Sequence, residues 1–131
     1  MRTQHRARRG EAAAVSDAHL VLLTKLEELD AYTHTVLHQF PKLERHLLCA
    51  DLRATTNRLL RLTVVAWKRK QKTAALFDLD VEIEVCRGLI RKAHRLSYIN
   101  TRRLDIWMRH INEIGRIVGA WIKHEGAATR K

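Results

Sequence analysis

The scarcity of turn-forming residues is the strongest constraint on the fold of this 131-residue chain. It contains one proline and five glycines. Many short strands would need more turns rich in these residues, so their scarcity favours a few long elements. Ala, Leu, Arg, Lys and Glu dominate the rest of the sequence, and all are good helix formers. The length suits one domain with a continuous core. The sequence therefore predicts an all-α domain.

Two amphipathic helices are predicted in the first half of the chain. Ser16 and Asp17 can cap the first, which ends at Phe40 because the residue before a proline is pushed out of the helical conformation. Pro41 suits the first turn of the second, and this helix ends in a basic cluster at residues 68–72 that complements the helix dipole. The first helix carries apolar residues at three- and four-residue steps: Leu20, Leu22, Leu23, Leu26, Leu29, Tyr32, Val36 and Leu37. The buried face of the second is expected to comprise Leu43, Leu47, Leu48, Leu52, Leu59, Leu62, Ala66 and Trp67.

The third segment is ambiguous when read alone. Apolar residues from Phe77 to Val85 alternate with acidic ones, which is a strand pattern. However, a single strand among helices would have no partner for its edges, and the apolar residues after Val85 return to helical spacing. The sequence therefore predicts a helix. Its four acidic residues are interpreted as a solvated face, not as paired catalytic carboxylates: Asp78, Asp80, Glu82 and Glu84.

The fourth segment has the clearest helical period. It opens after Asn100 and is expected to end near Gly126. Arg109 is expected to form exposed ion pairs with Asp105 and Glu113, each four residues away. The apolar stripe comprises Leu104, Trp107, Met108, Ile111, Ile114, Val118, Trp121 and Ile122.

Four helices joined by short loops predict an antiparallel up-down-up-down four-helix bundle over residues 16–126. A flexible basic tail is expected at residues 1–15 and a basic tail at 127–131. Cys49 and Cys86 fall on apolar stripes and match no metal spacing, which indicates core packing. No signal-peptide pattern and no run of about 18 apolar residues is visible, so we expect a cytoplasmic protein.

Positive charge is concentrated toward the end of the chain. The formal net charge is +11; residues 17–84 hold ten basic and ten acidic residues, whereas residues 85–131 hold eleven and three. Such a surface attracts polyanions, and release of condensed counterions gives affinity for nucleic acid without sequence preference. An anionic membrane or an acidic protein would also suit the charge, but no amphipathic anchor is visible. Nucleic acid is the favoured partner.

The fourth segment also carries a family resemblance. Residues 113–122 read Glu-Ile-Gly-Arg-Ile-Val-Gly-Ala-Trp-Ile, which resembles the C-terminal signature of the Avd family, the accessory variability determinants of diversity-generating retroelements. Phe40-Pro41-Lys42 followed by Glu44-Arg45 resembles the first interhelical turn of that family, and Arg87 and Arg91 fall where its third helix is basic.

The resemblance implies a non-catalytic bundle that assembles into a ring-like homopentamer with a basic exterior. It also implies association with the reverse transcriptase and template RNA of the retroelement, in support of mutagenic copying into complementary DNA. A structural scaffold of the type encoded in ribosomal-RNA intervening sequences, whose basic face binds an acidic protein, is the alternative.

Candidate binding residues follow from charge and spacing. Arg87, Arg91 and Arg95 stand at successive four-residue steps and form one ridge, with Lys92 beside it. Guanidinium groups suit phosphate better than ammonium groups do. The remaining basic residues expected on the same surface or its rim are Lys68, Arg69, Lys70, Arg102 and Arg103.

Other side chains receive structural interpretations. Gly115 and Gly119 would each cost about 1 kcal/mol relative to Ala inside a helix, so close packing within the bundle or between subunits is expected there. His34 and His38 are four apart, but the chain contains no Glu-x-x-His motif, and neither a metal nor a cofactor is predicted. No nucleophile–base set or phosphate loop is visible, so no catalytic residue is assigned. Trp67, Trp107 and Trp121 are expected to pack in the core or at a subunit interface and not to stack on bases.

Overall fold

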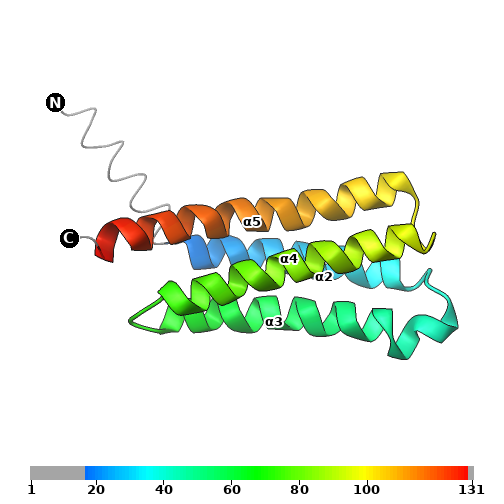
Figure 1. Cartoon of the computed structure of the whole chain (residues 1–131), viewed down its shortest axis with the longest axis horizontal. Helices are drawn as coiled ribbons and strands as arrows, with labels where there is room; N and C mark the ends of the chain where they lie inside the picture. Colours follow the sequence, from blue (N-terminus) through cyan, green and yellow to red (C-terminus); the bar gives the residue numbers. More distant parts are fainter. Residues whose placement is uncertain (1–16, 130–131) are drawn as a thin grey trace.

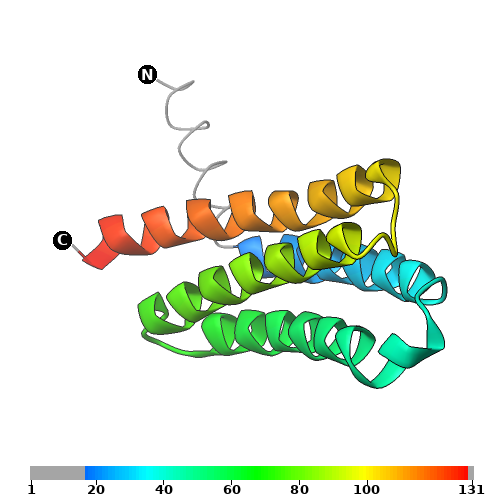
Figure 2. The same cartoon turned by 45° about the vertical axis from the view of Figure 1, so that its right-hand side comes forward.

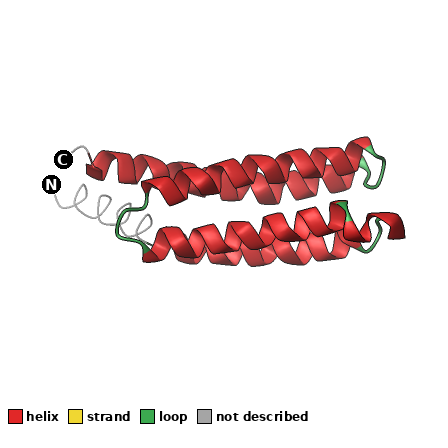
Figure 3. Ribbon diagram, turned by 60° about the horizontal axis from the view of Figure 1, so that its bottom comes forward, coloured by secondary structure: helices red, strands yellow, loops and turns green. Residues whose placement is uncertain are grey.

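The computed structural model describes residues 17–129 and the side chains of residues 17–126. Within that range the chain forms four α-helices and no strand (Figure 3). The helices are α2 (Ala18–Leu37), α3 (Leu48–Lys68), α4 (Thr73–Arg95) and α5 (Thr101–Thr129), and a short 3₁₀-helix, η1 (Lys42–His46), precedes α3. The predicted all-helical fold is confirmed, including the third segment. The 1–15 tail, Ser16 and residues 130–131 lie outside the described residues.

Each helix of the bundle packs on two others. α2 lies against α3 and α5, and α4 lies against the same two helices. In Figure 1 the colour sequence runs from left to right along α2, returns along α3, and repeats this course along α4 and α5. The turned view in Figure 2 shows the end of α5 projecting past the α3–α4 turn. The core between the helices contains fully buried side chains from all four: Leu22, Leu29, Leu52, Leu59, Leu76, Leu79, Ile83, Ile90, Trp107, Ile111 and Ile114.

Trp107 is the largest side chain in this core and is 0% exposed. Its indole Nε1–H donates a hydrogen bond of 3.0 Å to Oγ1 of Thr33 on α2, so its polar group is satisfied although it has no access to water. Trp121 is also buried. Trp67 was expected on the buried face of its helix, and that prediction is wrong, because its side chain is 37% exposed. Trp67 lies in the last turn of α3, where the ring of His19 stacks on it at 4.5 Å.

The start of the second helix also differs from the prediction. Pro41 adopts an extended ψ of 146°, the 3₁₀-turn η1 follows it, and Leu47 (φ −115°, ψ −103°) separates η1 from α3. The tighter turn changes the register of the side chains. Leu43 and Leu47, which were expected in the core, are therefore exposed.

The carboxylate of Glu44 caps the start of α3, where Pro41 was predicted to begin the helix. Its Oε2 accepts the backbone N–H of Leu48 at 3.1 Å, and its Oε1 accepts the hydroxyl of Tyr98 at 2.9 Å. The first bond satisfies a free amide in the first turn of α3. The second ties η1 to the turn between α4 and α5.

The α4–α5 turn contains a C-terminal cap of α4 and an N-terminal cap of α5. Ser97 has a positive φ of 62°, and the N–H groups of Ser97 and Tyr98 donate to the carbonyls of His94 and Ala93 at 3.0 Å each. This is the Schellman pattern. Asn100 then caps α5, because its Oδ1 accepts the N–H of Arg103 at 2.9 Å. At the other end, α5 continues to Thr129, beyond the predicted end at Gly126.

Both cysteines are buried and unpaired, which confirms their predicted place in the core. Burial raises the pKa of the Cys86 thiol to about 12, so this side chain stays protonated at neutral pH. Among residues 17–129, no helix combines the length and the apolar character needed to cross a membrane.

Candidate nucleic-acid interface

The basic cluster at the end of α3 contains one lysine with a structural role. Lys72 Nζ donates to the carbonyl oxygens of Ala66, Trp67 and Arg69 at 2.8, 2.7 and 2.8 Å. These carbonyls have no partner within the last turn of the helix, and the ammonium also complements the helix dipole. Lys72 therefore caps the C-terminal end of α3, in agreement with the predicted match between this basic cluster and the helix dipole. The neighbouring side chains that remain exposed are Lys68, Arg69 and Lys70.

Replacing Lys72 with alanine is expected to lower the free energy of unfolding by about 1.5–3 kcal/mol, the usual range for a hydrogen bond to a charged group. Three carbonyls would lose one shared donor. Lys70→Ala, two residues away and exposed, is the matched control and should change stability by less than about 0.5 kcal/mol. Chemical denaturation of both variants checks the difference, and equal midpoints would contradict the capping role.

Arg87 crosses from α4 to α5. Its Nε donates to Oδ1 of Asn112 at 2.9 Å, and its Nη1 pairs with Oε2 of Glu84 at 2.9 Å. The guanidinium lies over the backbone of Gly115: a Cβ on that residue would stand 2.5 Å from Nη2 of Arg87. Gly115 therefore makes room for a side chain of the neighbouring helix.

Arg91 shares the same carboxylate, since its Nη2 lies 3.4 Å from Oε1 of Glu84. Hydrogen bonds from Arg87 and then from Arg91 hold the pKa of the Glu84 carboxyl below its ordinary value. The two arginines and one glutamate carry one net positive charge. The ridge predicted from the sequence is thus partly neutralised at its first two positions.

An open groove lies beside this pair, between α4 and α5. It is lined by Arg87, Arg109, Asn112, Gly115 and Arg116. Arg109 and Arg116 are exposed and stand seven residues, or two helical turns, apart, which is about 10 Å along α5. The pairs expected for Arg109 with Asp105 and Glu113 are not among the ion pairs of the described residues; Glu113 instead pairs with Lys25 of α2 at 3.3 Å. Arg109 and Arg116 are thus candidate binding residues in addition to those predicted from charge and spacing.

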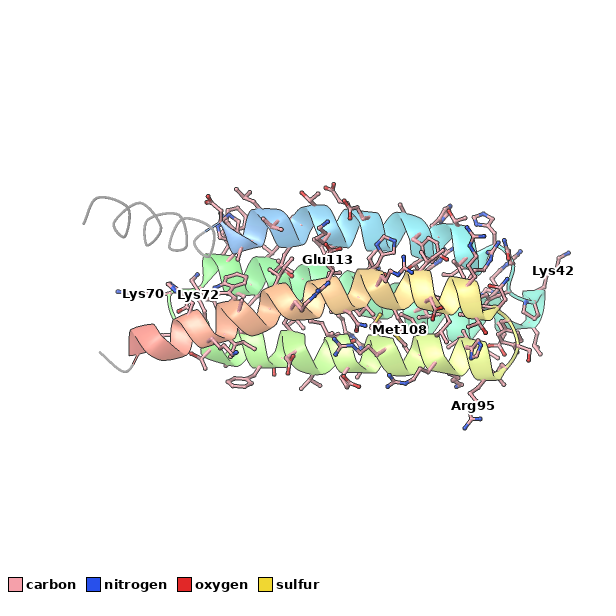
Figure 4. All side chains as sticks on the ribbon, turned by 90° about the horizontal axis from the view of Figure 1, so that it is seen from above. Lys42, Lys70, Lys72, Arg95, Met108 and Glu113 are labelled. Carbon is pink, nitrogen blue, oxygen red and sulfur yellow. The ribbon has the colours of Figure 1, made fainter. Side chains whose placement is uncertain are left out.

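The other predicted binding residues do not form one surface. Lys70 lies at one end of the bundle, beside the capping residue Lys72, whereas Arg95 lies toward the opposite end (Figure 4). The 23-residue helix α4 separates them by roughly 35 Å. Lys92, Arg95 and Arg102 are exposed, and Arg103 is half-buried. The positive residues therefore divide into two groups. One is the α3–α4 turn cluster (Lys68, Arg69, Lys70), and the other is the α4–α5 face, which consists of Arg87, Arg91, Lys92, Arg95, Arg102, Arg103, Arg109 and Arg116.

The two helix glycines differ in their surroundings. A Cβ at Gly119 would meet no described heavy atom within 4 Å, in contrast to Gly115. Gly119→Ala is therefore expected to raise the free energy of unfolding by about 0.5–1 kcal/mol through helix propensity. Gly115→Ala should gain less because Arg87 must move. Thermal unfolding of the two variants measures this, and an equal gain would contradict the placement of Arg87.

The side chains of His34 and His38 contact each other on α2. His38 Nδ1–H donates to the carbonyl of His34 at 2.7 Å, and the two rings meet edge to face at 4.6 Å. Across residues 17–129, no group of three or more His, Cys, Asp or Glu side chains is arranged to hold a metal ion.

The fold and the site together define a small helical-bundle protein with exposed arginines gathered along two neighbouring helices. A family profile described as bAvd-like matches residues 20–125, which is most of the chain. The protein belongs to the bAvd-like family, and the resemblance seen in residues 113–122 is confirmed. No individually curated protein matches the sequence.

Proposed function

We propose that this protein is an accessory subunit of a diversity-generating retroelement. It binds the reverse transcriptase of the element and its template RNA through a basic surface, and it supports mutagenic synthesis of complementary DNA in the cytoplasm. Membership of the bAvd-like family supports the accessory role. The resemblance to Avd proteins also implies that the subunit has no catalytic residues of its own.

The groove between α4 and α5 is the observation that carries nucleic-acid binding. Arg87, Arg109 and Arg116 line it from two helices, and guanidinium groups bind phosphate oxygens with two parallel hydrogen bonds. Asn112 adds a side-chain amide that already orients Arg87. Two exposed arginines two turns apart offer contacts to successive phosphates of one strand, without reading its bases.

The proposal includes assembly into a homopentameric ring, which the resemblance implies. A ring would present several grooves to one RNA molecule. Simultaneous contacts raise the overall affinity through effective concentration, even when each groove binds weakly.

Filter binding of a structured RNA at several salt concentrations tests this function, together with co-purification of the reverse transcriptase. The logarithm of the affinity should fall linearly with the logarithm of salt, with a slope of about −0.7 to −0.9 for each phosphate contacted. Retention of the reverse transcriptase without any RNA binding would overturn the RNA role and favour the scaffold function. Absence of both interactions would overturn the proposal.

A further inference from the structure

The solvent face of α4 carries an apolar stripe. Phe77, Val81 and Val85 stand four residues apart and are 53%, 62% and 44% exposed. The other sides of the helix are occupied. Leu79 and Ile83 point into the core, whereas Glu82 pairs with Arg58 of α3 at 3.5 Å and Arg87 bonds Asn112 of α5. The stripe therefore faces away from the rest of the bundle.

A second apolar stripe follows α3. Leu60, Val64 and Trp67 are exposed at steps of four and three residues. Arg58 marks the side of α3 that faces α4, whereas the stacking of Trp67 on His19 places this stripe on the side of α2. The two stripes thus lie on different faces of the same bundle.

The charges beside the two stripes have opposite signs. Asp78, Asp80 and Glu84 stand within three or four residues of the α4 stripe, which makes them its neighbours on the helix surface. Arg61 and Lys68 likewise stand three or four residues from members of the α3 stripe. In the described part of the chain, Asp78, Asp80, Arg61 and Lys68 take part in no ion pair, so these charges are available to a partner. An apolar stripe with acidic flanks complements one with basic flanks.

We propose that the α3 stripe of one copy binds the α4 stripe of a second copy. Two different surfaces meet in such a contact, so a pair of copies keeps one free stripe of each kind, the α4 stripe on one copy and the α3 stripe on the other. Repetition of this head-to-tail contact gives either a closed ring or an open filament. The inference rests on the proposed function for the choice of a ring, and on the complementary stripes for the contact itself.

Two charge substitutions test the contact in the full-length protein. Val81→Lys places a cation in the α4 stripe, opposite the basic flanks of its partner, and Leu60→Glu places an anion opposite the acidic flanks. In light scattering at micromolar concentration, the wild type should form an assembly, and each variant alone should have the 15.3 kDa mass of one chain. Leu43→Lys and Leu43→Glu, at an exposed leucine outside both stripes, are the matched controls and should assemble like the wild type.

Mixing the two variants tests the pairing of the stripes. Val81→Lys keeps an intact α3 stripe and Leu60→Glu keeps an intact α4 stripe, so the mixture should regain association to at least twice the mass of one chain. Circular dichroism should show unchanged helicity in every variant, since both positions are exposed. A monomeric wild type, variants that keep the wild-type mass, or a mixture that stays monomeric would each overturn the inference. A monomeric wild type would also overturn the ring in the proposed function, whereas variants that keep the wild-type mass would overturn the stripe contact alone. The measurement contains no RNA, so neither outcome is a failure of RNA binding.

Discussion

Replacing Trp107 with alanine is expected to lower the free energy of unfolding by about 3–5 kcal/mol, the range for truncation of a large buried aromatic side chain. The indole is fully buried in the core of the bundle and bonds Thr33 of α2. Its removal leaves a cavity and takes away the partner of a buried hydroxyl. A domain of this size is stable by about 5–15 kcal/mol, so this loss is a large part of the total. Urea denaturation followed by circular dichroism measures it.

Trp67→Ala is the control with the same chemistry in a different environment, and both substitutions are compared in the Val81→Lys background, which lacks the proposed subunit contact. Trp67 is partly exposed, and its ring stacks on His19 and lies 4.1 Å from the ammonium of Lys68. Its loss should cost at least about 2 kcal/mol less than the loss of Trp107, because little cavity remains at the surface. Equal destabilisation by the two substitutions would contradict the burial described for Trp107.

Replacing Arg109 and Arg116 together with alanine is expected to weaken RNA binding about 25- to 60-fold at 0.1 M salt. The estimate follows from counterion release: a slope of about 0.7–0.9 per contact corresponds to about 5- to 8-fold per contact between 1 M and 0.1 M salt. Both side chains are exposed, so the fold should be unaffected. Filter binding over a salt series gives both the affinity and the slope of its logarithm against the logarithm of salt concentration. This slope should become shallower by the amount expected for about two lost phosphate contacts.

Two other double variants locate the effect. Lys42→Ala with Arg45→Ala removes the same charge from η1, away from the groove, and should weaken binding only a fewfold through the general field. Arg87→Ala with Arg91→Ala should make the salt dependence shallower by the equivalent of only about one phosphate contact, because Glu84 already neutralises one of the two charges. If the η1 variant loses as much affinity as the groove variant, the groove is not the binding site.

The fold was largely predictable because the apolar period of each helix follows from the sequence. The third segment shows why: its alternating residues Phe77 to Val85 resemble a strand, yet the exposed members of that run form the outer stripe of α4. The start of α3 was not predictable from Pro41, because a 3₁₀-turn and an α-helix share the same proline signal. The observed turn is tied to the rest of the bundle by the bond from Tyr98 to Glu44, a tertiary contact that the local sequence does not indicate.

The site was less predictable because charge alone does not show which basic groups are already paired. Lys72 and Lys70 look equivalent in the sequence, but only Lys72 reaches three carbonyls. Arg109 looked like a member of ion pairs along its own helix, and the competing pair between Glu113 and Lys25 depends on how α2 packs on α5. The spacing of Arg109, Asn112 and Arg116 on one helix face was the available signal for the groove.

The bond between Glu44 and Tyr98 has a consequence for how the chain folds. Its partners are 54 residues apart, and the ring of Phe40 packs on that of Tyr98 at 5.3 Å in the same region. The α3–α4 hairpin needs only a short loop, whereas this contact must close a long one and bears the larger entropy cost. Local contacts form faster than distant ones. The hairpins α3–α4 and α4–α5, which both need only short loops, should therefore form first, and the docking of η1 on the α4–α5 turn should come last.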